Sequence, residues 1–364
     1  MRGLLHLWPV CKLIMKTTIQ YSTKLDLVNG TVDLNHGSGG KSSHQLITGI
    51  FTPHFNNVWL EQGNDQAIFN ITKTGRYAMA TDAPVISPLF FPGGNIGQLA
   101  LHGTINDLAM GGAWPLYLTA SFIIEEGFPL KDLLEISKSM GEVSRELRVP
   151  IIAGDTKVVE KGKGDGIFIS IAGLGEIIHP EIRLSGDQAK PGDKIILSGT
   201  MGDHGMAILA QREGLAFQTS LKSDHAPLHK LIKIMLDHVP QIALLRDPTR
   251  GGVATTLNEI CHQSDVGMVI DEIKIPIKKE VHGACELLGI DPLYVANEGK
   301  LLAIVPAEYA DKLISVMRLD PQGADAAIIG EVIEDKNHFL QMKTSFGGSR
   351  IVHWMSHEQL PRIC

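Results

Sequence analysis

The pattern of hydrophobic and polar residues alternates between strand-like and helix-like periods along most of the chain. Residues 66–82, "QAIFNITKTGRYAMATD", predict two short strands around a Thr-Gly turn, the second ending at Asp82. The segment "GQLALHGTINDLAM" then has hydrophobic residues at mostly helical spacing, and two glycines follow it. The next segment, "PLYLTASFII", has the composition of a strand. This part of the chain therefore predicts a strand, a helix and a further strand in succession.

A second helix is predicted in residues 129–150, "PLKDLLEISKSMGEVSRELRVP". Leu133, Ile136, Met140 and Val143 lie on one side of it, as expected for an amphipathic helix that packs on a core. The segments "IIAGDTK" and "GIFISIAGLGEII" follow and predict two more strands.

A break in composition separates two halves of the sequence. Pro191, Gly192 and Asp193 predict a linker, after which strand and helix patterns alternate again. Such a sequence predicts an α+β or α/β protein of two domains, which we place at residues 33–188 and 189–342.

The two ends of the chain lack this periodicity. Residues 1–32 predict a poorly ordered extension, and residues 343–364 predict a mobile tail with a hinge at Gly347 and Gly348. The tail ends in "PRIC", so that Cys364 is the last residue.

Composition excludes several classes of protein. Hydrophobic residues make up 44% of the 364 residues and charged residues 20%, as in globular proteins. The net charge of -7 gives no reason to expect nucleic acid or an anionic membrane as a partner. Four scattered cysteines do not make a disulfide framework or a zinc knuckle, which favours a reducing cytosol, and no apolar run is long enough to span a bilayer.

Four aspartates stand beside turns or strand ends, where their carboxylates could converge: Asp65, Asp82, Asp107 and Asp155. Mg²⁺ prefers hard oxygen ligands and completes its octahedron with water and substrate phosphates. The set would therefore suit Mg²⁺ ions that bridge the phosphates of ATP. The alternative is that each Asp serves a turn or a cap, as Asp often does.

A glycine-rich segment, "NHGSGGKSS", resembles the end of a P-loop but lacks the first glycine, because Asn35 stands at that position. The backbone N–H groups of Gly39 and Gly40, together with Lys41, could still contact a polyphosphate. A plain loop explains the segment equally well.

Two loops of the second half carry further candidates. In "LSGTMGDHGMAIL", Asp203 and His204 lie between a predicted strand and helix, where free N–H groups can hold an anion, although an ordinary loop is as good an explanation. "RDPTRGGVA" repeats this arrangement with Arg250 before a helix. In "NEGKLLAIV", Glu298 stands just ahead of a strand, a rigid place from which a general base can act.

These segments together resemble one known family. The matching stretches are "HGSGG", "TDAPVISPLFFPGGNIG", "NDLAMGGA", "AGDTKVVE", "SGTMGDHG", "RDPTRGG", "ANEGKL", "IGEV" and the terminal "PRIC". They are similar to the HypE family, the carbamoyl dehydratases of [NiFe]-hydrogenase maturation. That family belongs to the superfamily of aminoimidazole ribonucleotide (AIR) synthetase, selenophosphate synthetase and thiamine monophosphate kinase. The resemblance covers roughly residues 33–364.

The resemblance implies a fold and a set of site residues. The fold is a two-domain AIR-synthetase-like (PurM-like) α+β fold, in which the N-terminal domains form a dimeric β-barrel and the C-terminal domain is an α/β sandwich. The implied metal ligands are Asp65, Asp82, Asp107 and Asp155, although Asn64 stands where an acidic neighbour of Asp65 is expected. The implied contacts with ATP are Gly39, Gly40, Lys41, Asn106, Gly154, Thr156, Asp203 and His204, and the implied catalytic residues are Cys364, Glu298 and Lys157.

The resemblance also implies a reaction and partners. A HypF-like carbamoyltransferase would carbamoylate Cys364, and ATP with Mg²⁺ would drive dehydration of the S-carboxamide to a thiocyanate. The cyanide would pass to iron on a HypC–HypD-like scaffold, in the cytoplasm. The tail would move between an outward state for loading and an inward state for dehydration.

Two other functions stay open from the sequence. One is another ATP-using member of the superfamily, of the selenophosphate synthetase or small-molecule kinase type. Cys11 lies outside the glycine-rich surroundings that a selenophosphate synthetase needs, and a kinase has no use for Cys364. The other is a nucleotide-responsive binding module without turnover.

Overall fold

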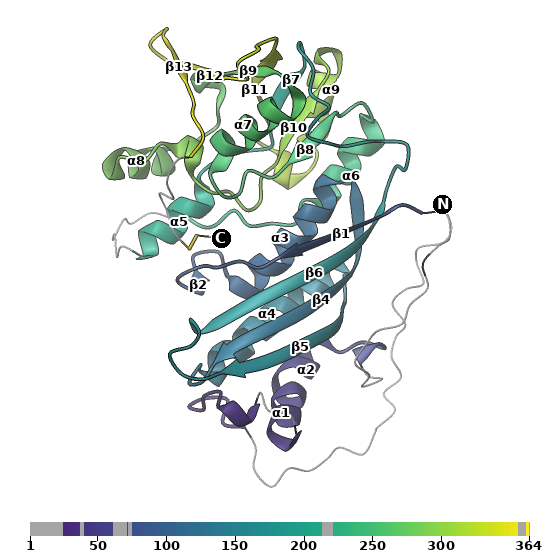
Figure 1. The fold of residues 1–364 in the computed structure, drawn as a ribbon, viewed down its shortest axis with the longest axis vertical. Helices are drawn as coiled ribbons and strands as arrows, with labels where there is room; N and C mark the ends of the chain where they lie inside the picture. The colour runs from purple at the N-terminus through teal and green to yellow at the C-terminus, as the bar shows by residue number, and fades with distance from the viewer. Residues whose placement is uncertain are drawn as a thin grey trace. The chain divides into compact units, whose positions relative to one another are not determined.

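The computed structural model describes residues 25–36, 40–60, 71, 75–212, 221–355 and 362–363. Their contacts group the chain into two compact units, each made of segments that are separate in sequence (Figure 1). The first unit contains residues 1–70 and 118–169, and the second contains residues 71–117 and 170–364.

Four strands that the sequence predicts form one sheet, in the order β1-β6-β4-β5. Their bounds are Tyr77–Asp82 for β1, Ala113–Glu125 for β4, Ile151–Val159 for β5 and Ile167–Ile177 for β6. β1 is antiparallel to β6 and β4 is parallel to β5. Side chains alternate between buried and exposed from Leu118 to Ile124, so one face of β4 is covered and the other is open. A short ribbon of β2 (Phe90–Phe91) and β3 (Gly94–Asn95) lies apart from this sheet.

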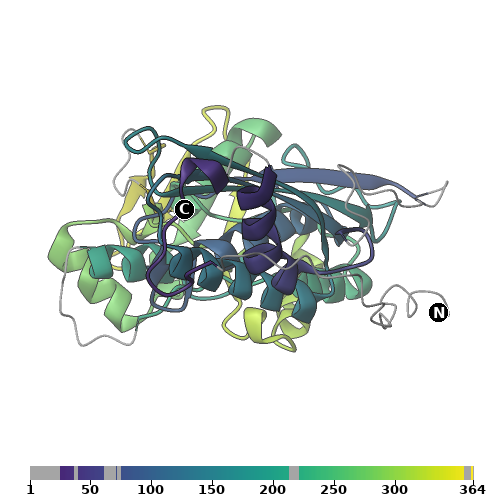
Figure 2. The ribbon, with the colours of Figure 1, turned by 90° about the horizontal axis from the view of Figure 1, so that it is seen from below.

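The first unit covers the buried face of β4 with helices (Figures 1 and 2). The rings of Phe51 and Phe55 stack, with centroids 5.8 Å apart, and the ring of Phe51 lies 4.7 Å from that of Phe122 on β4. The helical segments are η1 (Leu34–His36), α1 (Gly40–Leu46), η2 (Ile47–Phe51), α2 (Thr52–Phe55) and α4 (Leu130–Leu147). α4 begins directly after Pro129, as predicted, and its hydrophobic side is buried.

The expectation of a poorly ordered extension over residues 1–32 is wrong for residues 25–32, and residues 1–24 lie outside the described part of the chain. Val32 is fully buried, and its N–H donates to the carbonyl oxygen of Phe128 at 2.7 Å. Thr31 forms a β-bridge with Pro129. This segment pairs with the chain just ahead of α4 because its backbone groups would otherwise be buried without partners.

Helix α3 (Ile96–Met110) is the central helix of the second unit. The side chain of Asn95 caps its start by accepting hydrogen bonds from the N–H groups of Gly97 and Gln98, and the helix ends at Gly111 as predicted. α3 is buried on nearly all sides, and it packs against β1 and α6 (His229–His238). Such burial explains why its hydrophobic residues are not confined to one side of the helix.

A seven-stranded sheet forms the rest of the second unit, in the order β13-β12-β9-β11-β7-β10-β8. The strands are β7 (Lys194–Leu197), β8 (Leu244–Arg246), β9 (Gly267–Asp271), β10 (Leu302–Val305), β11 (Ala327–Ile333), β12 (Leu340–Lys343) and β13 (Ser349–Ile351). The helical segments are α5 (Asp203–Arg212), α7 (Gly252–Ser264), η4 (Glu272–Lys274), α8 (Lys279–Leu288), η5 (Pro292–Tyr294), α9 (Ala307–Met317) and η6 (Pro321–Gly323).

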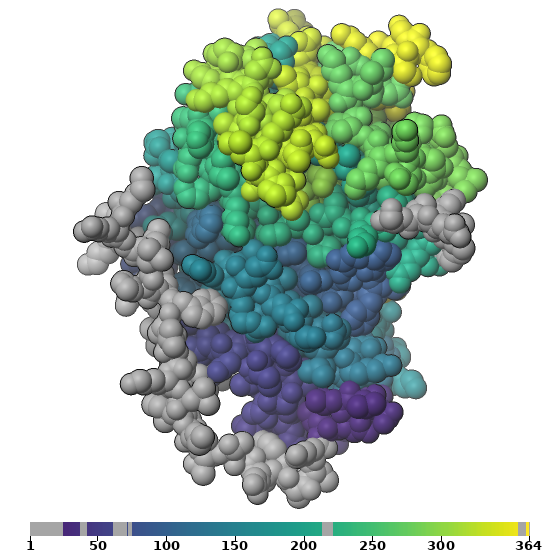
Figure 3. Space-filling view, turned by 180° about the vertical axis from the view of Figure 1, so that it is seen from behind, coloured from purple at the N-terminus to yellow at the C-terminus, as the bar shows by residue number. Residues whose placement is uncertain are grey.

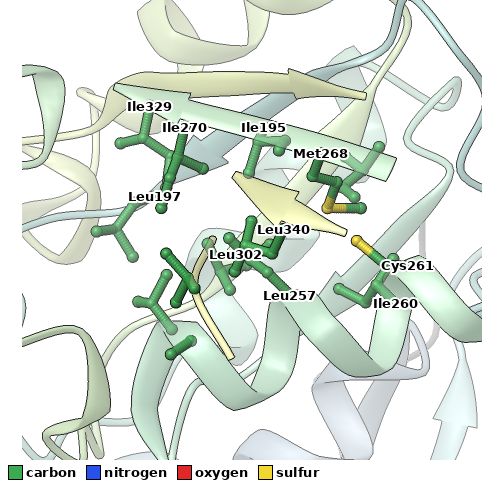
Figure 4. Packing of buried hydrophobic residues seen from close by; sticks show 14 of the residues in the cluster. Ile195, Leu197, Leu257, Ile260, Cys261, Met268, Ile270, Leu302, Ile329 and Leu340 are labelled. Atoms are coloured by element: carbon green, nitrogen blue, oxygen red, sulfur yellow. The ribbon is translucent and has the colours of Figure 1, made fainter. Parts of the chain in front are cut away.

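The two faces of this sheet support separate cores. Ile195 and Leu197 of β7 pack with Leu257 of α7 on one face, as Figure 4 shows. Ile196 points to the opposite face, where it packs with residues of α6 and α9. α9 lies at the surface of the unit, in the yellow-green area of Figure 3. When both faces of a strand are buried, apolar and polar residues do not alternate along it. This explains the three consecutive apolar residues of β7, Ile195 to Leu197.

The predicted start of the tail, at residue 343, is too early, because strand structure continues to Ile351. Residues 340–351 form a hairpin, with Gly347 in the turn at a positive φ of 84°, and β12 pairs in parallel with β9. Val352 is fully buried, and its carbonyl oxygen accepts a hydrogen bond from Asn258 of α7. The predicted hinge at Gly347 and Gly348 is therefore a hairpin turn at the edge of the sheet.

Burial of a histidine generates a prediction about acid stability. His229 is fully buried, its ring lies 4.8 Å from that of Trp114, and neither ring nitrogen has a hydrogen-bond partner within the described residues. Burial, with a smaller effect of Lys230, lowers the pKa of His229 to about 4, whereas an unfolded histidine titrates near 6.5. The unfolded state therefore gains a proton first as the pH falls, and stability is lost from about pH 6.5 down to about pH 4.

The wild type loses free energy of unfolding between pH 7 and pH 5. We expect His229→Phe to make this loss smaller by about 2 kcal/mol, because Phe cannot be protonated. Urea unfolding at the two pH values measures the effect. His238→Gln, at an exposed histidine whose ring bonds only to a backbone carbonyl of its own helix, is the control and should leave the loss unchanged. An equal loss in His229→Phe and in the wild type would contradict this explanation.

Candidate active site

Two of the predicted aspartates lie on neighbouring elements of the second unit. Asp82 ends β1, and its carboxylate lies over Gly103 of α3, where a Cβ atom would be 2.2 Å from Asp82 Oδ2. Asp107 follows Gly103 by one helical turn on the same face of α3. The absence of a side chain at Gly103 therefore lets the two carboxylates approach each other.

A third carboxylate, that of Asp247, completes this acidic cluster. Burial, followed by repulsion from Asp247 and Asp82, raises the pKa of the Asp107 carboxyl to about 7, although Arg246 and Arg250 act against the rise. The pKa values of Asp82 and Asp247 are also raised, chiefly by burial. Asp247 was not among the predicted site residues, because Arg250 and the glycines were the features of "RDPTRGGVA" that suggested a site. Its position directly after strand β8 is the same kind of position that identified the other aspartates, so it could have been found in the sequence.

The acidic cluster fits Mg²⁺ in chemical terms. Three carboxylates that repel one another create a negative site that a divalent cation would relieve. Among the described residues, no group of three or more His, Cys, Asp or Glu side chains is close enough to enclose a metal ion by itself. Mg²⁺ usually takes one or two carboxylates and completes its coordination with water and substrate phosphates.

Asn106, the neighbour of Asp107, joins α3 to two loops. Its Nδ2 donates to the carbonyl oxygens of Ala226 at 3.0 Å and Glu298 at 3.1 Å. Its Oδ1 accepts from the N–H of Leu228 at 2.8 Å. Asn106 is almost fully buried, and both of its amide hydrogens are used by these bonds. It therefore fixes Glu298 relative to the acidic cluster, and its predicted contact with ATP stays a prediction.

Glu298 is buried in the loop that joins η5 to β10. Its N–H donates to Asp224 Oδ1 at 3.1 Å, and Lys300 Nζ lies 3.4 Å from Asp224 Oδ2. Gly299 between them has no room for a side chain, since a Cβ atom there would lie 1.9 Å from the carbonyl oxygen of Asp224. The close passage of residues 224–226 explains the glycine in "NEGK". The structure thus presents Glu298 on a rigid backbone, as a general base requires.

Asn297 gives the same loop a second attachment. Its Oδ1 accepts from the N–H of Gly202 at 2.7 Å, and its Nδ2 donates to the carbonyl oxygen of Pro248 at 2.9 Å. Pro248 directly follows Asp247. The two asparagines together link Asp107, Asp247 and Glu298 through backbone segments of one unit.

Asp203 and His204 begin α5, but protein groups surround both. Asp203 Oδ2 accepts from Thr200 Oγ1 at 2.7 Å and pairs with Lys278 Nζ at 2.8 Å. His204 accepts from Ser223 Oγ at Nδ1 and donates from Nε2 to the carbonyl oxygen of Ile363, each at 2.7 Å. Both ring nitrogens are occupied, so the structure does not support the predicted contact of His204 with a phosphate. A lone sequence motif could not reveal this, because the partner lies 159 residues away.

A polar cavity of about 470 Å³ lies beside Asp203 within the second unit. It is lined by Ser198, Gly199, Thr200, Asp203, Lys222, Ser223, Asp224, His225, Ala226, Lys278, Lys300, Pro321, Gln322 and Asp325. The residues of the acidic cluster do not line it. The cavity and the acidic cluster are therefore separate features, which the loop around Glu298 connects.

Four predicted site residues lie on β5 of the first unit: Gly154, Asp155, Thr156 and Lys157. Lys157 Nζ contacts the two carboxylate oxygens of Asp155 at 2.7 and 2.8 Å. The hydrogen bond from Lys157 lowers the pKa of Asp155. Both side chains are mostly exposed, so this pair is open to a ligand and adds little to stability.

The remaining predicted residues cannot be placed in the site. Gly39, Asp65 and Cys364 lie outside the described residues. Gly40 and Lys41 begin α1, so the predicted glycine-rich loop becomes a helix earlier than expected. The roles assigned to these five residues stay predictions.

Two family models match the chain. They describe AIR synthase related protein, with the N-terminal domain matching residues 63–177 and the C-terminal domain matching residues 190–343. The chain is therefore an AIR synthase related protein of two domains.

Relatives and solved structures narrow this class. A curated relative from Cupriavidus necator, named carbamoyl dehydratase HypE, is 59% identical over 344 residues, which cover 94% of this chain and 98% of that protein. A crystal structure described as hydrogenase maturation protein HypE in complex with ATP has a TM-score of 0.87 and 47% identity, covering 91% of this chain and 99% of that one. A HypE–HypF complex has a TM-score of 0.74 and 48% identity, covering 85% and 99%. The chain belongs to the carbamoyl dehydratase HypE family.

The close approach of Asp82 to Gly103 generates a prediction. We expect Gly103→Ala to displace the Asp82 carboxylate, because the new methyl group would lie 2.2 Å from Oδ2. Binding of Mg²⁺–ATP should weaken by about tenfold, the effect of losing one good interaction of roughly 1.4 kcal/mol. Calorimetric titration measures the affinity.

Gly283→Ala is the matched control, because a Cβ atom at this position of α8 meets no other atom within 4 Å. Thermal melting should show little change for Gly103→Ala, since only the end of a side chain has to move. Unchanged affinity in Gly103→Ala would show that Asp82 does not take part in binding.

Proposed function

We propose that this protein dehydrates an S-carboxamide on its own Cys364 to a thiocyanate at the expense of ATP, and so supplies the cyanide ligand for the iron of [NiFe]-hydrogenases. The observation that carries the proposal is the linkage, through Asn106, of the acidic cluster to a buried Glu298 in a chain of the HypE family. The acidic cluster suits the binding of phosphates through Mg²⁺, and Glu298 suits proton transfer.

The chemistry explains why ATP is needed. Dehydration must break the carbon–oxygen bond of the carboxamide, and oxide is a poor leaving group. Attack of the amide oxygen on the γ-phosphorus of ATP, with loss of one of the two N–H protons, releases ADP and turns that oxygen into part of a phosphate ester. Loss of this phosphate and of the remaining N–H proton then leaves the carbon–nitrogen triple bond. One water is thereby removed from the carboxamide, and its oxygen leaves in inorganic phosphate.

The residues divide this work between them. Glu298 accepts an amide proton, since its buried carboxylate is held on a rigid loop. Lys157 contributes a positive charge toward the transferring phosphate. Asp82, Asp107 and Asp155 would hold Mg²⁺, and Asp247 joins Asp82 and Asp107 in the acidic cluster. When bound, Mg²⁺ neutralises charge on the phosphates during transfer.

Partners follow from the reaction. Loading of Cys364 requires a HypF-like carbamoyltransferase, and the solved HypE–HypF complex of relatives supports this. A HypC–HypD-like iron scaffold would accept the cyanide. The proposed reaction needs Cys364 as a reduced thiol, so we place the protein in the cytoplasm. No helix within the described residues is long and apolar enough to cross a membrane.

Intact-mass spectrometry tests the proposed reaction. The full chain is incubated with a HypF-like carbamoyltransferase, carbamoyl phosphate, ATP and Mg²⁺. We expect the loaded chain to lose one water and to release one phosphate per loaded thiol. Glu298→Gln should be carbamoylated normally. Its dehydration should be at least about 100-fold slower, because it lacks the carboxylate that acts as the base.

Two further variants make the assay specific. Glu308→Gln, an exposed glutamate in the first turn of α9, is the matched control and should behave as the wild type. Cys364→Ser should be neither loaded nor dehydrated. An unchanged mass of the loaded wild-type chain without phosphate release would contradict the proposal and favour a binding module.

We also propose that the chain acts as a homodimer in which a β-barrel is shared between two copies. The open face of β4 supports this, because its Ile123 is 46% exposed, and Met79 of β1 is 78% exposed. Apolar side chains on an open sheet face mark an interaction surface.

Ile123→Lys should convert the dimer into monomers, since a charge would be buried in the shared sheet face. Light scattering coupled to size-exclusion chromatography measures the mass. Leu319→Lys is the control, because Leu319 is also exposed but follows α9, which packs on the seven-stranded sheet. A dimer that persists in Ile123→Lys would refute the shared barrel.

A further inference from the structure

The two described residues before the terminal cysteine dock on the second unit. The carbonyl oxygen of Arg362 accepts from the N–H of Ser87 at 3.1 Å and from Nη2 of Arg212 at 2.7 Å. The carbonyl oxygen of Ile363 accepts from Nε2 of His204 at 2.7 Å. Three donors, the N–H of Ser87 and two side chains of α5, therefore hold two successive carbonyl groups.

The side chains of these two residues differ in burial. Ile363 is 4% exposed, whereas Arg362 is exposed. The unit thus contacts the backbone of both residues and buries the side chain of Ile363. Such recognition depends on the position of a residue in the chain more than on its type.

The donors are themselves fixed by other contacts. Arg212 also donates to the carbonyl oxygen of Ser87, from both Nε and Nη2. Ser223 Oγ donates to Nδ1 of His204, so the proton of the neutral ring sits on Nε2 and points at Ile363. His204 is fully buried in the first turn of α5, and Arg212 ends the same helix. One helix therefore carries both side-chain donors.

The backbone of Arg362 opposes docking by a small conformational cost. Its φ of +56° lies in the left-handed region, which costs a residue with a side chain about 1 kcal/mol. Release of the tail would remove this strain, while docking regains the hydrogen bonds and the burial of Ile363. The balance suits a segment that has to leave and return.

We propose that His204 and Arg212 are positioning residues that fix the register of the C-terminus. They hold the carbonyl groups of residues 362 and 363, so that the side chain of the residue that follows is presented for dehydration. The inference rests on the proposed function, and it assigns to His204 a role different from nucleotide binding. It also explains why the reactive thiol belongs at one fixed distance beyond two backbone carbonyls.

The first test measures how fast Cys364 in the full chain is alkylated by iodoacetamide, followed for that residue by peptide mass spectrometry. Cys261 and Cys285 are buried and do not interfere. We expect Arg212→Met and His204→Met each to increase the rate about tenfold, because each loses one hydrogen bond that holds the docked tail. His204→Gln should stay close to the wild type, since the amide of Gln can donate where Nε2 does.

The matched control is Arg318→Met. Arg318 also donates to a backbone carbonyl, that of Ala326 at 2.9 Å, but it has no contact with the C-terminus among the described hydrogen bonds. The melting temperature of all variants is measured in parallel. Equal alkylation rates in wild type, Arg212→Met and His204→Met would overturn the proposal.

The second test separates positioning from loading. One glycine is inserted between Ile363 and Cys364, which leaves the docked residues unchanged and moves the thiol by one position. Carbamoylation by the HypF-like enzyme should proceed, while loss of water should slow by at least about tenfold, because the carboxamide is misplaced. Dehydration at the wild-type rate would overturn the register, whereas absence of dehydration in the wild type would refute the proposed function itself.

Discussion

The site of the second unit depends on one buried amide, that of Asn106. Its two N–H groups and its oxygen bind three backbone groups from two loops, which no other side chain of similar size can do. An aspartate would place oxygen against two carbonyl oxygens, and a leucine would leave all three groups without partners. Because Asn106 precedes Asp107 on a buried helix, the amide transmits the position of α3 to Glu298. The candidate base and the acidic cluster are therefore parts of one rigid arrangement.

Electrostatics divides this unit into regions with different tasks. The acidic cluster concentrates negative charge, and the raised pKa of Asp107 reflects burial and repulsion from its neighbours. The cavity beside Asp203 instead contains three lysines and three aspartates. Burial lowers the pKa of His204 and keeps its ring neutral, so it acts as a directed hydrogen-bond donor and not as a charge. A neutral donor can hold a carbonyl oxygen without attracting phosphate.

Much of the architecture was predictable because local patterns determine local structure. The helix ended by Gly111, the amphipathic helix after Pro129 and the apolar strand at Lys194 follow from spacing and capping alone. The errors have a common cause. Residues 25–32 and 343–352 look irregular in sequence, but they gain order by pairing with distant segments. Asp247 was missed for the same reason, since a single Asp after a strand acquires meaning only beside Asp82 and Asp107.

The sequence by itself determined the class of fold, the family resemblance and the types of residue that the chemistry needs, because these depend on periodicity and on motifs within short segments. The tertiary structure decided which of those residues act together. It paired His204 with Ile363 across 159 positions, and it used Asn106 as a support for Glu298. Hydrogen-bond partners are set by the path of the whole chain, so a short motif can name a donor but not its acceptor.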